Sequence, residues 1–398
     1  MMTILAANLF IIRSIHQHKA EDTSPSRSIT SKSSFRQNTN LTLQSGTDET
    51  NGDKVNHSHS HHKRKDDDDD GRFHDSEKLK VVNILAGAGI EMTESLYESL
   101  PTWSEITSLY GSEAKIIGLE TCAAYREKVP SHDIYTGPAG LFNTGTFLLD
   151  KSLHRFCTFK ERRAFTKDDP NPNHGFKYKA GTLFQVPWGK HNPATTRLKH
   201  WAAAGPRDIK QAHVLPIIMV KDPYHWMQSM CRHSYQVKWP NQHSDHCPQL
   251  VKPSRVQVPF GSGTTIYKSL VHMWNEWNGQ YIHYDNGSME EFPRLVIRYE
   301  DLLFHQKDVV RQVCDCVGGT VASSNYIHLE DSAAKPTVLR MHSGSSDLVS
   351  AIMRYGKDAD RLKGMTSEDV SFAKSLLDDK LMTLFGYNHP NETTRRAL

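Results

Sequence analysis

The sequence predicts an α/β fold in which a mostly parallel central sheet is flanked by helices. Two runs, 212–220 and 294–298, have the apolar, β-branched composition of buried strands, and each stops at a charged turn. Helical patterns lie between and after them, at 146–156, 226–233, 267–277 and 309–317. Strands that alternate with helices form βαβ units, whose right-handed crossovers make neighbouring strands parallel.

The folded part is expected to be one domain that covers residues 79–398. Residues 14–78 are rich in Ser, His and Asp and poor in apolar residues, which predicts a disordered stem because burial cannot offset chain entropy. Residues 1–13 are expected to be a short apolar signal or anchor segment, since a membrane span needs about 20 apolar residues. Folding is expected to begin with the apolar, β-rich run 78–85.

Shorter elements are expected along the rest of the chain. The pattern predicts amphipathic helices at 91–100 and 103–110, and a strand or a helix start at 115–120. The run 181–186 predicts a short strand that ends in a turn, and the run 370–385 predicts a helix.

Cysteine usage and glycosylation signals bear on the compartment. The six cysteines, an even number, leave the disulfide pairing open; a bridge between Cys231 and Cys247 would close a loop over the segment between them. N-x-[ST] sites permit a secretory location; they begin at Asn40, Asn56, Asn286 and Asn391. No C-x2-C pair is present, which argues against a structural zinc site.

A glycine-rich stretch follows the apolar start of 135–149. It crosses Gly140-x4-Gly145-Thr146 and then resumes with apolar residues that can open a helix. Glycines permit positive φ and close backbone approach, so the N–H groups of such a loop and the positive end of the helix can hold an anion. The Walker form has a lysine after the second glycine, and here that residue is Thr146.

Two other strand ends carry polar residues that could share a site with this loop. One is Lys190-His191-x-Pro193, and the other is Lys221-Asp222-Pro223, with Ser229 further along the following helix. Because the carboxyl ends of parallel strands meet at one edge of a sheet, we expect the three segments to converge in one crevice.

Together these segments resemble the PAPS-dependent sulfotransferases, a P-loop-like family with cytosolic and Golgi members. Residues 143–147 occupy the place of the family's 5′-phosphosulfate loop, [KR]-[ST]-G-[TS]-[TS]. Lys221 and Ser229 reproduce the spacing of its 3′-phosphate motif, an Arg followed eight residues later by Ser. The K-[TS]-H-x-P strand end of many members is similar to 190–193, and the R-Y-E-D-L of Golgi members is similar to 298–302. The resemblance covers about 134–303 and implies a P-loop NTP hydrolase-like sulfotransferase fold.

The chain departs from the family pattern in three places. Asn143 stands where the loop has Lys or Arg, so the neutralising cation must come from elsewhere, and Lys190 is the candidate. Lys221 replaces the 3′-phosphate Arg, which keeps the charge but loses the bidentate fork. The late R-K-G loop of the family has only a faint counterpart around Arg340.

The resemblance implies roles for individual residues. His191 would be the general base, because its pKa lies near working pH, and Lys190 would neutralise developing charge. The PAPS-binding residues would be Gly140, Asn143, Thr144, Gly145, Thr146, Phe147, Lys221, Ser229 and Arg340. PAPS would be the co-substrate, with no metal required, and Arg298 and Glu300 are expected to form a structural ion pair.

The function predicted on this basis is transfer of a sulfuryl group from PAPS to a hydroxyl of a carbohydrate or glycoconjugate, in the Golgi lumen or membrane. Loops such as 236–258 would build the acceptor pocket. The alternatives are a non-catalytic nucleotide- or glycan-binding protein, favoured by Asn143, and a Mg²⁺-dependent phosphotransferase, favoured by the glycine-rich loop alone; the cytoplasm is the alternative location. A net charge of +3 without a basic helix gives no reason to expect a nucleic-acid partner.

Overall fold

The computed structural model divides the chain into two units, residues 1–67 and 68–398, and all the residues it describes belong to the second. The described residues are 75–159, 181–199, 209–240, 242, 246–251, 255–260, 263–283, 292–322, 326–329 and 348–390. The predictions for residues 14–74 of the stem, the apolar N-terminal segment, the four N-x-[ST] asparagines and Arg340 lie outside these residues. The last residues of the predicted stem, 75–78, are described, and they form the cap and first turn of a helix, so the prediction of disorder is wrong there.

The central sheet has four strands in the order β1 (Ile116–Ile117), β7 (Leu295–Arg298), β4 (Val214–Val220) and β2 (Tyr135–Gly140). The last three are parallel and β1 is antiparallel to β7, so the predicted α/β class with a mostly parallel sheet is confirmed. Every residue of β4 and β7 is buried, as expected for strands covered on both faces. Gly140 pairs with Met219 and Val220 with Arg298, so the parallel strands end at one edge.

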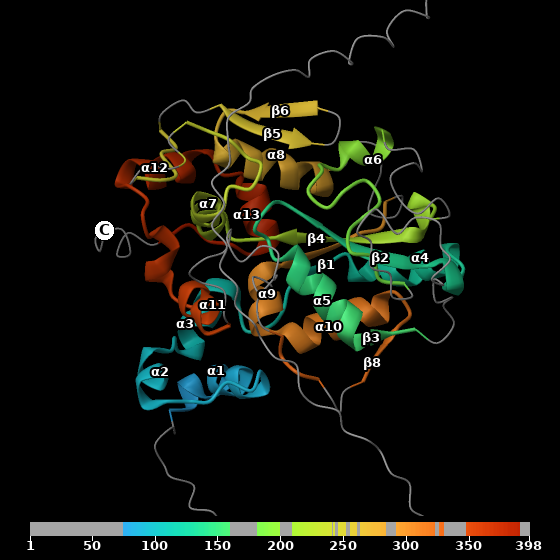
Figure 1. Ribbon diagram of the computed structural model, residues 1–398, viewed down its shortest axis with the longest axis horizontal. Helices are drawn as coiled ribbons and strands as arrows, with labels where there is room; N and C mark the ends of the chain where they lie inside the picture. Colours follow the sequence, from blue (N-terminus) through green and yellow to red (C-terminus); the bar gives the residue numbers. More distant parts are fainter. Residues whose placement is uncertain are drawn as a thin grey trace, which may run out of the picture. The chain divides into compact units, whose positions relative to one another are not determined.

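Helices cover both faces of this sheet (Figure 1). Figure 1 shows α7 (Pro223–Arg232) and α8 (Leu270–Ile282) on one side of the strands, and α5 (Thr146–Phe156) and α10 (Gln306–Cys316) on the other. The other helices are α1 (Ser76–Gly87), α2 (Glu94–Ser99), α3 (Trp103–Tyr110), α4 (Cys122–Lys128), α6 (Thr195–Lys199), α9 (Tyr299–Phe304), α11 (Leu348–Tyr355), α12 (Ser367–Leu376) and α13 (Asp379–Phe385). Two small antiparallel sheets pair β3 (Cys157–Thr158) with β8 (Thr320–Val321), and β5 (Val256–Phe260) with β6 (Gly263–Tyr267).

The expected β-rich run at 78–85 is wrong, because these residues lie within α1. Val81 and Leu85 are fully buried and four residues apart, so the run has one apolar helical face. The Asp75 side chain accepts a hydrogen bond from the Glu77 amide and caps the helix, which therefore begins ahead of the expected start at 79.

Two other expected elements also differ. The run 181–186 forms one isolated bridge, Thr182 with Thr136, and not a strand, although its Leu183 and Val186 amides donate to β2 carbonyls. The predicted helix 370–385 is two helices, because Asp378 caps α13 and interrupts the run. Neither α11 nor the β5–β6 hairpin was predicted.

Three disulfides join all six cysteines: Cys122–Cys316, Cys157–Cys314 and Cys231–Cys247. The first two tie α4 and the start of β3 to α10, and the third closes the loop that follows α7. Such bonds persist in an oxidising compartment like that of the secretory pathway rather than in the cytoplasm. Among the described residues, no helix is long and apolar enough to cross a membrane.

Candidate active site

The glycine-rich loop joins the end of β2 to the start of α5, and its geometry requires both glycines. At Gly140 a Cβ would lie 2.4 Å from the Thr144 hydroxyl oxygen. At Gly145, whose φ is 78°, a Cβ would lie 2.4 Å from the Tyr299 ring. Gly145 begins α5 without a side-chain cap, and the positive end of the helix at Thr146 suits an anion.

Asn143 connects this loop to α7. Its φ is 64°, a left-handed conformation that asparagine tolerates better than most residues. Its side-chain amide donates to the carbonyl oxygens of His233 at 2.8 Å and Ser229 at 3.3 Å, at the end of α7. The Asn143 side chain therefore holds the loop against α7.

His191 lies against the start of the loop, at Gly140. Its Nδ1 is 2.7 Å from the carbonyl oxygen of Gly140, and its ring stacks on Phe142 with centroids 4.3 Å apart. Because a carbonyl oxygen only accepts, Nδ1 must carry the proton, and the lone pair of the neutral ring is then on Nε2. In this tautomer Nε2 is the ring nitrogen that can accept a proton.

Lys190 reaches the same loop through its main chain. Its carbonyl oxygen accepts from the Gly140 amide at 2.9 Å, and its nearly buried side chain places the ammonium 3.6 Å from the centroid of the Phe184 ring. Phe184 also contacts Phe147, in the first turn of α5, with centroids 6.3 Å apart. Lys190 therefore adds positive charge beside the uncapped helix start.

Lys221 is buried where β4 ends and binds the loop from the α7 side. Its ammonium donates to the carbonyl oxygen of Asn143 at 3.2 Å, to the Ser229 hydroxyl at 3.3 Å and to the Tyr355 hydroxyl at 2.6 Å. It also lies 4.1 Å from the Tyr299 ring centroid and 4.2 Å from that of Tyr355. Arg232 approaches the same hydroxyl, with its Nη2 2.9 Å from the Ser229 oxygen.

The surroundings of Ser229 are strongly positive. Burial lowers the pKa of His225 well below its ordinary value, and four charges add to this effect: those of Arg361, Lys221, Arg232 and Arg354. Burial favours the neutral phenol of Tyr355, but the charges of Lys221 and Arg232 outweigh burial and lower its pKa. Within the described parts of the chain, neither Lys221 nor Arg232 forms an ion pair with a carboxylate. This region therefore suits an anion.

Three buried tryptophans hold the three predicted segments in place. The indole of Trp226, on α7, donates to the carbonyl oxygen of Phe142 at 2.8 Å. On α8, Trp274 donates to the carbonyl oxygen of Lys221 at 3.0 Å, and Trp277 donates to that of His191, also at 3.0 Å. Each segment of the site is thus fixed by one core side chain.

The expected Arg298–Glu300 pair is wrong. Arg298 pairs with Asp301, with its Nε 2.6 Å from the carboxylate. Glu300 instead accepts from the Asp222 amide at 3.1 Å and from the Tyr387 hydroxyl at 2.8 Å. Burial, with the nearby charge of Asp222, raises the pKa of Glu300 to about 7.

The structure brings together every predicted site residue that it describes. His191 contacts the start of the loop at Gly140, and Lys221 contacts its middle at Asn143. Neither Arg232 nor Tyr355 was predicted as a site residue. Arg232 lies one helical turn beyond Ser229, a spacing that could have revealed it; Tyr355 comes from the unpredicted α11 and gives no local signal.

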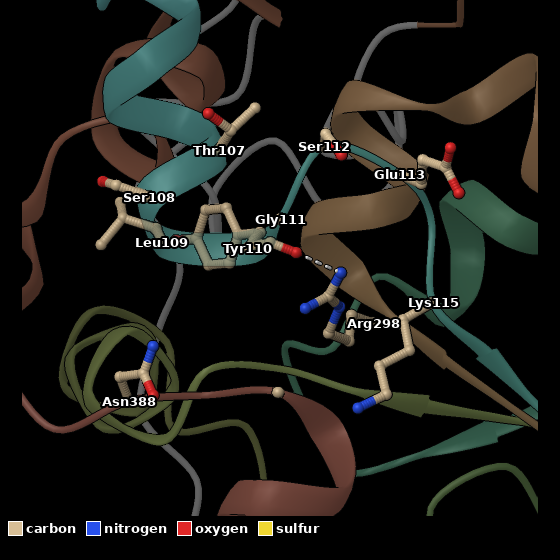
Figure 2. A pocket seen from close by; sticks show the side chains of 11 residues that line it. Thr107, Ser108, Leu109, Tyr110, Gly111, Ser112, Glu113, Lys115, Arg298 and Asn388 are labelled. Carbon is tan, nitrogen blue, oxygen red and sulfur yellow. Dashed lines mark hydrogen bonds between the residues drawn. The ribbon is translucent and has the colours of Figure 1, made fainter.

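A pocket of about 490 Å³ lies at the same sheet edge, beyond β7. Figure 2 shows Arg298 between Tyr110, whose carbonyl oxygen accepts from Nη2 at 2.7 Å, and Lys115. Burial and the charge of Arg298 lower the pKa of Lys115. None of the residues predicted to bind PAPS lines this pocket.

No protein-family model, curated protein or solved structure matches the chain.

Proposed function

We propose that this protein is a sulfotransferase that moves a sulfuryl group from PAPS to a hydroxyl of a carbohydrate or glycoconjugate acceptor in the Golgi. One observation carries the proposal: His191 and the Lys221–Ser229 cluster contact the same glycine-rich loop, at Gly140 and at Asn143. A base and two separate groups of positive charge along one anion-binding loop match a nucleotide with phosphates at both its 5′ and 3′ positions. The three disulfides are consistent with the secretory pathway.

The residues suggest how the reaction would proceed. The acceptor hydroxyl attacks sulfur in line, and its proton passes to Nε2 of His191 as the new oxygen–sulfur bond forms. The bond between sulfur and the bridging phosphate oxygen breaks, and adenosine 3′,5′-bisphosphate leaves. The N–H groups at the start of α5, together with Lys190, stabilise the charge that develops on the 5′-phosphate.

The alternative of a non-catalytic nucleotide-binding protein rests on Asn143, because its side chain is bound to α7 and supplies no charge to the 5′ end. Asp222, the acidic residue that follows β4, is bound by Arg361 at 2.7 Å and caps α7. Asp222 therefore gives little support to a phosphotransferase that would need it for Mg²⁺.

Purified protein separates these functions. Transfer of ³⁵S from labelled PAPS to a panel of glycans, with tighter binding of adenosine 3′,5′-bisphosphate than of ADP, is the result expected of a sulfotransferase. Selective binding without turnover on any acceptor would support the non-catalytic protein. Mg²⁺-dependent consumption of ATP would support the phosphotransferase and contradict the proposal.

A further inference from the structure

The hydrogen-bonding capacity of Lys221 is used within the protein. An ammonium has three N–H donors, and those of Lys221 bind Asn143, Ser229 and Tyr355. Lys221 is also only 3% exposed. It can contribute charge to a bound phosphate, but it has no donor left to contact one unless an internal hydrogen bond breaks.

Ser229 is committed in the same way. Its hydroxyl donates to the carbonyl oxygen of His225 at 2.8 Å, and its oxygen accepts from both Lys221 and Arg232. One donor and two lone pairs are all that a serine hydroxyl offers. The two side chains that the sequence assigns to the 3′-phosphate therefore bind each other in this structure.

Two arginines border the cluster with donors to spare. A guanidinium has five N–H donors, and Arg232 is an exposed residue that uses only some of them, in hydrogen bonds to the hydroxyls of Ser229 and Tyr355. Arg354 directly precedes Tyr355 on α11, whose hydroxyl binds Lys221. The positive charge of Arg354 is close enough to contribute to lowering the pKa of His225. No carboxylate among the described residues pairs with either arginine.

We infer that Arg232 and Arg354 contact the 3′-phosphate directly, while Lys221 and Ser229 position α11 beside the loop through Tyr355. This inference rests on the proposed function, and it accounts for one departure from the family pattern. The guanidinium fork of Arg232 beside Ser229, with that of Arg354 next to Tyr355, would supply the bidentate geometry that lysine lacks at position 221. They would make the site selective for nucleotides that carry a 3′-phosphate.

The test is a calorimetric comparison of adenosine 3′,5′-bisphosphate with adenosine 5′-monophosphate, which differ only in the 3′-phosphate. Wild type should prefer the bisphosphate. Arg232→Ala and Arg354→Ala should each weaken binding of the bisphosphate by about 10- to 100-fold and leave binding of the monophosphate unchanged. Arg232→Lys, which keeps charge without the fork, should fall between. Arg311→Ala, on the exposed face of α10, is the matched control and should behave as wild type.

The outcomes distinguish this inference from the function on which it rests. Full selectivity for the bisphosphate in both alanine variants would overturn the inference and leave the proposed function standing. Wild type that binds neither nucleotide, or both equally, would overturn both. Thermal melting of each variant checks that a loss of binding is not a loss of folding.

Discussion

His191 is held in one tautomer by a single main-chain oxygen, that of Gly140. If Nε2 is the general base, His191→Ala should lower turnover by about 10²- to 10⁴-fold and leave the affinity for adenosine 3′,5′-bisphosphate unchanged. His191→Asn is the matched variant, because its amide can still donate toward Gly140 but cannot accept a proton at neutral pH. Single-turnover transfer of ³⁵S should show equal losses in the two variants. Wild-type turnover in His191→Ala would remove the base assignment.

Trp274 and Trp277 provide a paired test on one helix, since each donates to the carbonyl oxygen of a different site residue. Trp277→Phe frees the main chain of His191 and should lower turnover by roughly tenfold or more with little change in nucleotide affinity. Trp274→Phe removes the hydrogen bond to the carbonyl oxygen of Lys221 and should weaken binding of adenosine 3′,5′-bisphosphate instead. The measurement is the turnover rate and the dissociation constant for adenosine 3′,5′-bisphosphate, determined for both variants. Equal effects on both constants would mean that the tryptophans only stabilise the core.

At the scale of elements, the turn from β2 into α5 depends on Gly145. Gly145→Ala places a Cβ against the Tyr299 ring and demands a positive φ from alanine, so both stability and nucleotide binding should fall. Gly279→Ala is the control: a Cβ there meets nothing within 4 Å, and in the middle of α8 alanine should stabilise by about 0.5–1 kcal/mol. Urea unfolding of both variants measures the difference. A Gly145→Ala protein as stable as wild type would show that the turn tolerates a side chain.

Local patterns predicted the elements that carry the loop, because their signals lie within a few residues. The helix predicted at 146–156 is α5, since Gly145 precedes an apolar face, and the β-branched run at 212–220 contains β4. Local sequence patterns gave the wrong secondary structure where tertiary contacts determine it. Thr182 lies beside β2 but makes one bridge only, and in α1 helical burial of Val81 and Leu85 outweighs the β propensity of its valines.

The site divides in the same way. Spacing placed Gly145 and Lys221 at one sheet edge, because the parallel strands β2 and β4 end together. His191 lies at the same edge although the run before it makes only one bridge and is not a strand. Spacing could not reveal that Tyr355, more than a hundred residues beyond Ser229, accepts a hydrogen bond from Lys221. No local rule links a helix to a strand end that is so distant in the sequence. Nor could spacing assign the hydrogen bonds of Asn143, which depend on how α7 docks.

For the molecule as a whole, the disulfides link distant parts of the chain. Cys122–Cys316 and Cys157–Cys314 span 194 and 157 residues and meet in α10, whereas Cys231–Cys247 spans 16. The even cysteine count predicted that bridges could form, but pairing across such separations depends on the folded geometry. The two long bridges join α10 to α4 and to the start of β3. The short bridge restrains the chain that leaves α7, next to Arg232.

Glu300 links the pH of the compartment to the stability of the whole domain. Its pKa rises from an ordinary 4.5 to about 7 on folding, because the carboxyl is buried and lies near Asp222. Below pH 4.5 the folded and unfolded chains both hold the proton. Between about 4.5 and 7 only the folded chain keeps it, so the contribution of Glu300 to stability is lost as pH rises through this window, and the loss is complete above it.

The loss is on the order of 3 kcal/mol. The buried His225 and His328 act in the opposite direction, because burial lowers their pKa values and the folded protein then gains stability as pH rises. Glu300→Gln keeps the shape of the side chain without a titrating proton, so its unfolding midpoint at pH 8, relative to that at pH 5, should be higher than in wild type. Glu98→Gln changes an exposed carboxyl and should leave the wild-type difference intact. Thermal melting of the three proteins at both pH values decides the matter. If the difference between the midpoints at pH 5 and pH 8 is the same in Glu300→Gln as in wild type, the pH dependence comes from other groups. The Asp222 amide and the Tyr387 hydroxyl would then stabilise the buried carboxylate of Glu300 without a measurable cost.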